Sequence, residues 1–425
     1  INEIWRQASS RSSFYQIKSM QRIVFINLHA NEFLVKTLNK YIWKQSCAFK
    51  HKYFLDYLLR QPDIEVCNYI NEDGFTLISS FPKFIMKGLK RLRFLENRIV
   101  MKLNGLDTGK IKVIHDRNRI RPDDIVVGYR HVPSSLTDMS RIDAFRVVSM
   151  IHFHGEQHDS DLISSANPDF LFNECDLSAT SEIFRRYYGW YQRPFIVHPF
   201  VAAGRFRRFK PFAERETRCF STGTITYKVH KEFLEVYGDS CDQPTRKQIL
   251  VNAGQLEPYC ACYNSDYLED SEMKKYLPGD NFFLHYYKVW YNKTHAGQQK
   301  KYFSFDMVEK FNDFKMCLVG EEVLGVPGIG FVEGMSCGCA YIGQNIGYYE
   351  DLGMKEGVHY IGYDGSLEDL KRKISYYQQP EHQDELERIA NAGYEFAMEH
   401  FRGDIVAEML LNKLIDSKDS AKNNV

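Results

Sequence analysis

Short apolar runs that end in polar or glycine-containing loops recur along the first half of the chain. They are typical of buried parallel strands, and they cover residues 22–28, 111–115, 124–129, 146–153 and 195–199. The first run ends in a polar loop, after which the pattern predicts a helix over 33–59. Strands that alternate with helices and carry polar residues at their carboxyl ends predict a doubly wound α/β domain, in which a ligand binds at that edge.

The same pattern restarts after Pro211. Residues 218–223 predict a strand whose Gly223 begins a turn into a helix that carries Lys228 and Lys231. Further strand-like units are expected at 248–253, 315–319, 340–342 and 359–362. We therefore expect an α/β protein with two similar halves: an N-terminal domain over 1–205, a C-terminal domain over 206–415, and a polar tail over 416–425.

Composition places the chain among ordinary globular proteins and removes one class of partner. Of its 425 residues, 44% are hydrophobic and 26% are charged, which excludes collagen-like and disordered classes. Lys and Arg number 55, as do Asp and Glu, so the formal net charge is zero. We expect no nucleic-acid partner, because such binders usually carry a basic balance.

The cysteines and the chain start bear on the cellular compartment. Ten cysteines occur at irregular spacing, and the pairs Cys260/Cys262 and Cys337/Cys339 lack the spacing of a zinc site. We expect reduced thiols, and therefore a cytoplasmic protein. No apolar run approaches the ~18 residues of a membrane span. The chain opens at Ile1 rather than Met, so we expect a trimmed sequence and leave an upstream segment open.

Residues 81–121 depart from the charge balance. They hold twelve Lys or Arg residues against Glu96, Asp107 and Asp116. Apolar residues recur among these cations at helical spacing: Phe84, Ile85, Leu89, Leu92, Leu95 and Ile99. One interpretation is a basic amphipathic helix that lies on an anionic membrane surface. The other is a helix packed on the core whose outer face is basic.

A glycine-rich block over 325–343 carries the clearest chemical signal. It predicts a glycine loop, a short helix over 331–337, a helix stop at Gly338 and then a strand. Backbone N–H groups of the loop would hold a diphosphate, and Glu333 would accept hydrogen bonds from the two hydroxyls of a ribose. The block therefore predicts a nucleotide-diphosphate site that needs no metal and no further cofactor.

This block resembles the C-terminal signature of GT-B glycosyltransferases of the "glycosyl transferases group 1" type. The family pattern is a Glu, seven residues, a second Glu, a small residue, Met, and a Gly before a strand. Downstream and upstream segments are similar in register, and residues 330–401 also resemble the spore-protein-type branch of the superfamily. The matching segments are 345–350, 356–360, 366–370, 385–401, 176–182 and 197–211.

The resemblance implies a GT-B fold, with two Rossmann-like domains facing across a cleft, and a nucleotide-diphosphate sugar as donor. It assigns the donor ribose to Glu333, and the donor phosphates and sugar to the loop residues Gly328, Ile329 and Gly330. A basic residue after Gly223 and Thr224, either Lys228 or Lys231, would neutralise the diphosphate. The position of the family's first Glu is occupied by Gly325 here, and Glu321 and Glu322 just upstream are the candidates to replace it. The resemblance implies retaining stereochemistry, and this departure at Gly325 leaves that outcome open.

A polar cluster follows the predicted strand over 146–153. His152, His154 and Glu156, with His158 beyond them, lie where GT-B enzymes bind acceptors. One interpretation is a general base or acceptor ligand, since an inverting transfer needs a base at the acceptor hydroxyl. The second is a zinc site built from His and carboxylate ligands. The third is a solvated loop.

Aromatic residues are dense over 256–303, where the family has a short strand–helix passage. Aromatic faces stack on sugar rings, and they also form protein cores, so both interpretations stay open.

The whole sequence predicts an enzyme that transfers a sugar from a nucleotide-diphosphate donor to a glycan or lipid-linked glycan acceptor. Bacterial surface polysaccharide synthesis, at the inner face of the cytoplasmic membrane, is the expected setting. Two alternatives remain: a non-catalytic GT-B module that binds nucleotide or glycan, and a nucleotide-sugar epimerase. A dehydrogenase is disfavoured, because no G-x-G-x-x-G follows the first strand.

Overall fold

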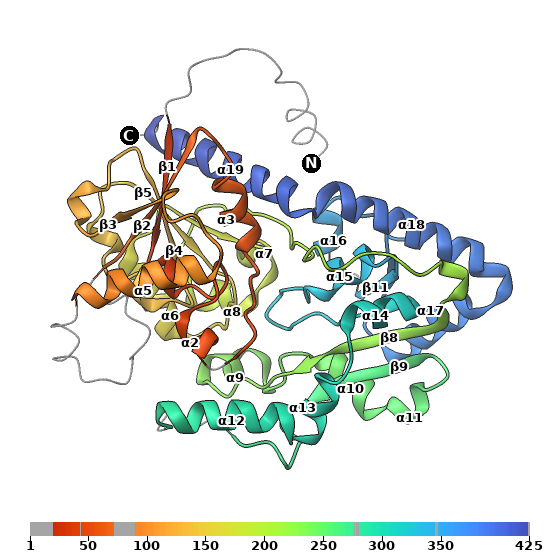
Figure 1. Ribbon diagram of the computed structural model, residues 1–425. Helices are drawn as coiled ribbons and strands as arrows, with labels where there is room; N and C mark the ends of the chain where they lie inside the picture. Colours follow the sequence, from red (N-terminus) through yellow and green to blue (C-terminus); the bar gives the residue numbers. More distant parts are fainter. Residues whose placement is uncertain are drawn as a thin grey trace. The chain divides into compact units, whose positions relative to one another are not determined.

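The computed structural model describes residues 20–42, 44–71, 90–275, 277, 280–344 and 347–423 (Figure 1). These residues form two compact units. Unit 1 comprises Ala179–Ile183 and Pro199–Ile405, and unit 2 comprises the residues up to Ser178, Phe184–His198 and those from Val406 onward. Each unit has its own parallel sheet, as the alternation of apolar runs and helices predicts.

The described strands of unit 2 form one parallel sheet in the order β3-β2-β1-β4-β5-β6-β7. The chain runs from β1 outward to β3 and then returns to the other side of β1 at β4. The sheet therefore has its topological switch point between β1 and β4. The strands are β1 (Gln21–Ile26), β2 (Ile64–Tyr69), β3 (Ile111–Ile114), β4 (Ile125–Tyr129), β5 (Phe145–Ser149), β6 (Phe170–Asn173) and β7 (Ile196–Val197).

The helix predicted over 33–59 is wrong. The structure has two short helices, α2 (Leu38–Ile42) and α3 (Lys52–Leu58), with an irregular stretch between them. Lys44 and Phe49 adopt positive φ angles of 48° and 47°, which no right-handed helix allows. The other helices that contribute to unit 2 are α5 (Lys90–Leu103), α6 (Gln157–Ala166), α7 (Leu177–Thr180), α8 (Glu182–Tyr187) and α19 (Gly403–Asn423).

The last helix, α19, contributes to the core of unit 2. Ala407, Leu410, Leu411 and Leu414 pack in the same buried cluster as residues of β1 and β4. The residues expected as a polar tail continue this helix as far as Asn423. The division into units thus falls at 198/199 and again at 405/406, besides the segment 179–183.

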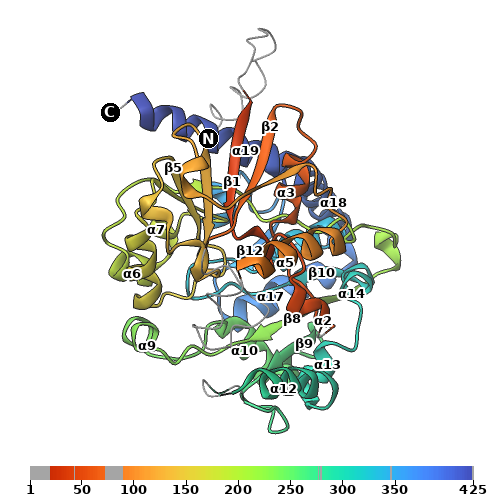
Figure 2. The same ribbon diagram turned by 60° about the vertical axis from the view of Figure 1, so that its left-hand side comes forward.

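The described strands of unit 1 form a parallel sheet in the order β12-β11-β10-β8-β9. Here the chain passes from β8 to β9 on one side and then to β10 on the other, so the switch point lies between β8 and β10. The strands are β8 (Glu216–Ile225), β9 (Cys260–Asp266), β10 (Phe314–Leu318), β11 (Ala340–Gln344) and β12 (Ile361–Tyr363). Figures 1 and 2 both show β8 and β9 side by side.

The strand predicted at 248–253 is wrong, because these residues belong mainly to helix α10 (Pro244–Val251). Proline suits the first turn of a helix, and the buried Ile249 faces the core. The strand lies later, at β9. The remaining helices of unit 1 are α9 (Lys231–Tyr237), α11 (Ala253–Leu256), α12 (Phe282–Thr294), α13 (Gly297–Tyr302), α14 (Met307–Asp313), α15 (Gly330–Ser336), α16 (Tyr348–Asp351), α17 (Leu367–Gln378) and α18 (Gln383–His400).

Candidate functional site

The glycine loop of unit 1 lies directly against the end of β10. A Cβ atom on Gly330 would come within 2.8 Å of both methyl carbons of Val319. A Cβ on Gly328 would come within 2.9 Å of the Val319 carbonyl oxygen and 2.8 Å of Arg246 Nη2. Both positions therefore require glycine, because any side chain would push the loop away from the strand end.

Arg246 is the residue around which the predicted donor-site residues gather. It lies on α10 and is buried, and its Nη1 donates to the carbonyl oxygen of Thr224 at 2.8 Å. Its Nη2 donates to the carbonyl oxygen of Gly320 at 3.1 Å. Gly223, with φ of 131°, passes so close that a Cβ would lie 2.8 Å from Arg246 Nε. Arg246 thus connects the carboxyl ends of β8 and β10 at the switch point.

Sequence reasoning missed Arg246. It belongs to no motif, and it precedes a stretch that the apolar pattern assigned to a strand. The signal that identifies it is topological, since only the sheet order brings α10 to the ends of β8 and β10. The acceptors of its Nη atoms are three neutral carbonyls, those of Thr224, Val319 and Gly320, and its Nε has no hydrogen-bond partner within the described residues.

The two lysines predicted to neutralise a diphosphate occupy different surroundings. Lys228 is largely buried and forms an ion pair with Asp242, at 3.3 Å between Nζ and Oδ2. The side chain of Lys231 is 83% exposed and pairs with Glu235 along α9. Burial raises the pKa of Asp242 to about 6, with a further increase from nearby Glu322, while Lys228 opposes the shift.

Glu321 and Glu322 are the two candidates to replace the family's first Glu. Glu321 is buried and accepts hydrogen bonds from Tyr349 Oη at 2.6 Å and from the backbone N–H of Gln344 at 3.0 Å. Burial raises its pKa. Gly325 has φ of 80°, and a Cβ there would lie 2.1 Å from the carbonyl oxygen of Thr180. Glu321 is therefore held inside the core, and Gly325 admits no side chain. Glu322 is half-buried, so it is the carboxylate of this loop that a donor could reach.

Helix α15 follows the loop, with Ile329 at its N-cap. Its other residues are buried, and Glu333 in the first turn is half-buried. Gly338 has φ of 79° just after the helix, so the predicted helix stop is confirmed. The sequence-predicted loop, helix and strand therefore occur in the expected order, with Glu333 as the accessible side chain of α15.

The polar cluster of unit 2 follows β5, as predicted. His152 is exposed and has a left-handed φ of 56°, and its ring lies 4.8 Å from that of Phe33. The rings of His152 and His154 stack with centroids 6.2 Å apart, whereas Glu156 is the N-cap of α6. Arg130 donates to the carbonyl oxygen of His152 and pairs with Asp159, so this arginine holds the strained loop in place.

His131, at the end of β4, is a second residue that sequence reasoning did not single out. Its Nε2 lies 3.0 Å from Asn31 Oδ1, an oxygen that also accepts the Phe33 N–H. Nε2 is therefore the protonated nitrogen of His131. Burial lowers the pKa of His131 to about 2, with further lowering from His152 and Arg130. His131 is therefore uncharged at neutral pH, and its ring packs against the rings of Phe33 and Tyr129.

Within the described residues, the geometry supports neither a metal site nor a membrane-spanning helix. No group of three or more His, Cys, Asp or Glu side chains in them is arranged to hold a metal ion. The zinc interpretation of His152, His154 and Glu156 therefore has no geometric support. Among the helices described, none is long and apolar enough to cross a bilayer.

Helix α5 is the described part of the basic segment, and it packs on the core of unit 2 through Val100 and Met101, whereas the predicted apolar face of Leu92, Leu95 and Ile99 is exposed. Leu95 is 51% exposed and Leu103 is 47% exposed, whereas Glu96 and Asn97 are buried. Asn97 accepts a hydrogen bond from Asn68 of β2 at 2.6 Å. The expected cations and apolar residues over 81–89 lie outside the described residues.

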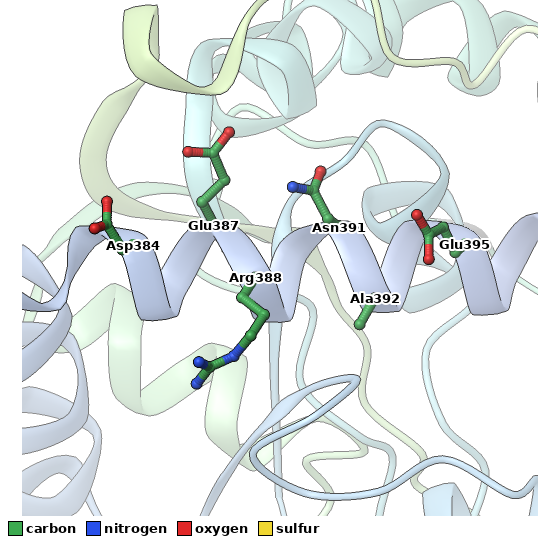
Figure 3. Close-up of a pocket in the computed structure, with 6 residues that line it drawn as sticks. All are labelled: Asp384, Glu387, Arg388, Asn391, Ala392 and Glu395. Carbon is green, nitrogen blue, oxygen red and sulfur yellow. The ribbon is translucent and has the colours of Figure 1, made fainter.

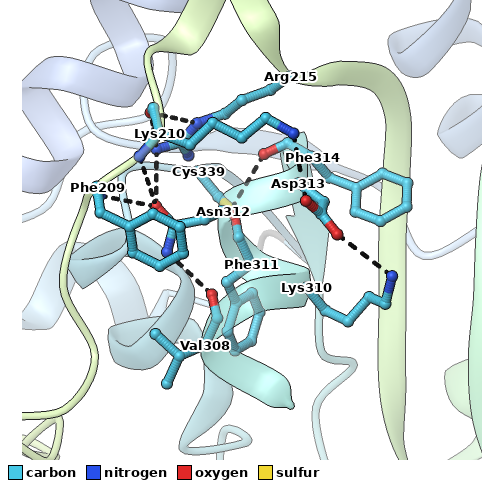
Figure 4. Close-up of polar contacts among 10 residues, drawn as sticks. All are labelled: Phe209, Lys210, Arg215, Val308, Lys310, Phe311, Asn312, Asp313, Phe314 and Cys339. Carbon is cyan, nitrogen blue, oxygen red and sulfur yellow. Dashed lines mark hydrogen bonds and ion pairs between the residues drawn. The ribbon is translucent and has the colours of Figure 1, made fainter. Parts of the chain in front are cut away.

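Two surface depressions lie outside the predicted site. One is lined by residues of α18 alone, drawn in Figure 3: Asp384, Glu387, Arg388, Asn391, Ala392 and Glu395. The other lies beside a polar network centred on Asn312, drawn in Figure 4. Asn312 accepts from the Phe209 N–H and donates to the carbonyl oxygens of Arg207 and Val308. The network anchors the segment before β8 to α14.

Comparisons with known proteins add likenesses of fold. No protein-family model matches the chain, and a search of curated proteins found no significant match. Among solved structures, HepE of Anabaena in complex with UDP-glucose is 12% identical, covering 93% of this chain and 99% of that one, with a TM-score of 0.48. Sucrose-phosphate synthase of Thermosynechococcus elongatus is 10% identical over 94% and 100%, with a TM-score of 0.47. A glycosyltransferase of Rickettsia africae is 11% identical over 95% and 99%, with a TM-score of 0.46.

Proposed function

We propose that the protein is a glycosyltransferase of the GT-B type that binds a nucleotide-diphosphate sugar in unit 1. One observation carries the proposal: Gly223, Thr224 and Gly328 converge on Arg246 at the switch point between β8 and β10. Open α/β sheets bind ligands outside the carboxyl ends of their strands at this point. A buried guanidinium whose acceptors are neutral carbonyls suits an anionic ligand there.

In this proposal the charge of the donor diphosphate is met by protein cations and backbone N–H groups. Arg246 and Lys228 supply the positive charge, and Gly328, Ile329 and Gly330 bring backbone close to the phosphates. Glu333 accepts from the ribose hydroxyls. Stabilising the departing nucleoside diphosphate in this way lowers the barrier to transfer without a metal ion.

The acceptor is assigned to the strand ends of unit 2. His152 and His154 are stacked beside Phe33, and Arg130 holds the backbone between them and α6. We assign to one of these histidines, or to Glu156, the contact with the acceptor hydroxyl. Substituting His152→Asn, His154→Asn and Glu156→Gln separately should lower turnover for the residue that acts, whereas exposed His158→Asn is the matched control.

The acceptor class is a glycan or lipid-linked glycan, in bacterial surface polysaccharide synthesis. The exposed apolar residues of α5 among cations support a position at an anionic membrane surface. The retaining outcome implied by the family resemblance is checked by the anomeric proton coupling of the product.

The donor site is tested by a thermal-shift panel of UDP, GDP, CMP, TDP and ADP on the wild type and on Glu333→Ala. At about 100 times the dissociation constant, a ligand stabilises the fold by ~2.7 kcal/mol. We expect one nucleotide to stabilise the wild type and to stabilise Glu333→Ala less. No stabilisation by any nucleotide would contradict the proposal. NMR of the donor sugar with enzyme and no acceptor tests for an epimerase, which would convert the free donor. Transfer to any added acceptor would exclude a non-catalytic binding module.

A further inference from the structure

Helix α12 buries its polar side. The side chains of Lys288 and Asn292 are 9% and 3% exposed. Lys288 Nζ lies 2.7 Å from both carboxylate oxygens of Asp280. Asn292 accepts from the Lys274 N–H at 2.7 Å and donates to the Lys274 carbonyl at 3.0 Å. The inner contacts of this helix are therefore an ion pair and a pair of amide hydrogen bonds.

The opposite side of α12 is aromatic and faces solvent. Phe283, Tyr287 and Trp290 are 72%, 46% and 54% exposed, and they follow one another at i, i+4 and i+7. Leu284, at 41%, extends the same surface. Residues with this spacing share one face of a helix, which in a globular protein normally packs on the core. We call these four residues the α12 apolar face.

The segments that flank helix α12 also carry exposed apolar residues. Leu277 before the helix and Phe303 after α13 are 61% and 49% exposed. Figures 1 and 2 both show α12 next to α13, and α13 in turn packs on β9. Large exposed apolar patches on a soluble protein usually mark an interaction surface.

Lysines outnumber acids in the segment that contains the α12 apolar face, which follows the acids Asp266, Glu269 and Asp270. Residues 271–303 contain six lysines and two acids, Glu272 and Asp280, and Asp280 is already paired with Lys288. Lys274 Nζ lies 4.2 Å from the centroid of the Tyr291 ring, and Lys293 Nζ lies 5.4 Å from that of Phe303. Lysines thus lie among the aromatic rings of this region.

We propose that the α12 apolar face docks on an anionic lipid surface. Phe, Tyr, Trp and Leu enter the boundary between headgroups and acyl chains, and the lysines around them meet the anionic headgroups. A soluble glycan fits less well, because Phe283 and Leu284 offer no hydrogen bonds to sugar hydroxyls. The excess of lysine gives the charge complementarity that an anionic bilayer requires.

The test is co-sedimentation of the full chain with vesicles of phosphatidylcholine alone and of phosphatidylcholine with phosphatidylglycerol. We expect binding to the anionic vesicles that weakens as salt is added. The triple variant Phe283→Ser/Tyr287→Ser/Trp290→Ser should bind at least ~10-fold more weakly, because it removes the buried apolar area. The matched control is Val229→Ser/Val251→Ser, which changes two valines that are 78% and 65% exposed and should bind as the wild type does.

Further outcomes separate other occupants of this face. Equal vesicle binding by the triple variant and the wild type, or no binding by the wild type, would overturn the proposal. The proposal would also be overturned if Leu95→Ser/Ile99→Ser of α5 abolished vesicle binding while the triple variant kept it. A dimer by light scattering that the triple variant converts to a monomer, with lipid binding unchanged, would assign the face to a second copy. Because the substituted residues are exposed and distant in sequence from the glycine loop, nucleotide stabilisation should be unchanged, so a failed lipid test and a failed donor site are read separately.

Discussion

At the scale of single residues, the contrast between Lys228 and Lys231 gives the most specific prediction about the donor site. Lys228→Ala should weaken nucleoside-diphosphate binding by roughly 10- to 150-fold, since a charge-assisted contact to phosphate is worth roughly 1.5–3 kcal/mol. Lys231→Ala removes an exposed lysine and should leave the affinity unchanged. Isothermal titration with UDP and GDP measures both, and equal losses in the two variants would contradict the assignment.

His131 gives a prediction about pH. Its folded-state pKa, about 2, lies far below the ordinary value of 6.5, so the unfolded chain binds a proton that the folded chain does not. Its contribution is present above pH 6.5 and is lost as the pH falls below that value, by about 1.4 kcal/mol per pH unit. Urea unfolding between pH 7 and pH 5 measures how the free energy of unfolding changes with pH. We expect this dependence to be weaker in His131→Gln than in the wild type, by the uptake of up to one proton on unfolding. Identical slopes would show that His131 is protonated in the folded protein.

At the scale of elements, the contact between the glycine loop and the end of β10 should be intolerant of added volume. Gly330→Ala places a methyl group 2.8 Å from the methyl carbons of Val319 and should destabilise the fold by about 1–3 kcal/mol. The control is Gly254→Ala, where a Cβ meets nothing within 4 Å. The double variant Gly330→Ala/Val319→Ala makes room for the methyl group and should recover part of any nucleotide affinity lost in the single variant. Thermal melts and titration of each variant test this, and an unaffected Gly330→Ala would contradict the packing.

The segment before β8 depends on Asn312 for its position. Its side chain is fully buried and bonds to backbone groups of Phe209 and Val308, which Figure 4 draws, and to the carbonyl oxygen of Arg207. Asn312→Leu leaves these groups without partners and should cost about 2–4 kcal/mol of stability. Chemical denaturation measures the loss, and a value under about 0.5 kcal/mol, typical of a surface change, would contradict a structural role.

The sequence predicts the elements whose signals are local. The run at 22–28 covers most of β1 (Gln21–Ile26), and Gly338 ends α15 because a left-handed residue is required there. The helix over 33–59 and the strand over 248–253 failed, because apolar content without a turn signal does not distinguish a helix from a strand or from an irregular segment. On α5 the spacing of Leu92, Leu95 and Ile99 left open whether that face packs on the core, and the structure exposes it, because Glu96 and Asn97 with Val100 and Met101 form the inner side instead.

The candidate site was predictable only in part, for a related reason. The glycine loop and Glu333 are adjacent in sequence, so a motif finds them. Arg246 and His131 reach the site through sheet order and through hydrogen bonds to Thr224 and Asn31, which are distant in sequence from them. Spacing along the chain carries no information about such contacts.

At the scale of the whole molecule, the two units share an arrangement and differ in what it gathers. Each has a parallel sheet with a switch point, between β1 and β4 in unit 2 and between β8 and β10 in unit 1. Histidines lie at the first, and Arg246 with the glycine loop lies at the second. Each unit also carries a helix, α5 or α12, with exposed apolar residues and buried polar ones. A formal net charge of zero thus conceals local basic and apolar surfaces.

Hydrogen–deuterium exchange of the full chain with and without UDP or GDP tests the donor site around Arg246. We expect slower exchange in peptides that cover 223–228 and 326–333 when the nucleotide binds. Peptides that cover α18, whose residues line the depression in Figure 3, should exchange at the same rate in both states. Protection on α18, or a bound nucleotide that protects neither strand end nor glycine loop, would contradict a donor site built around Arg246.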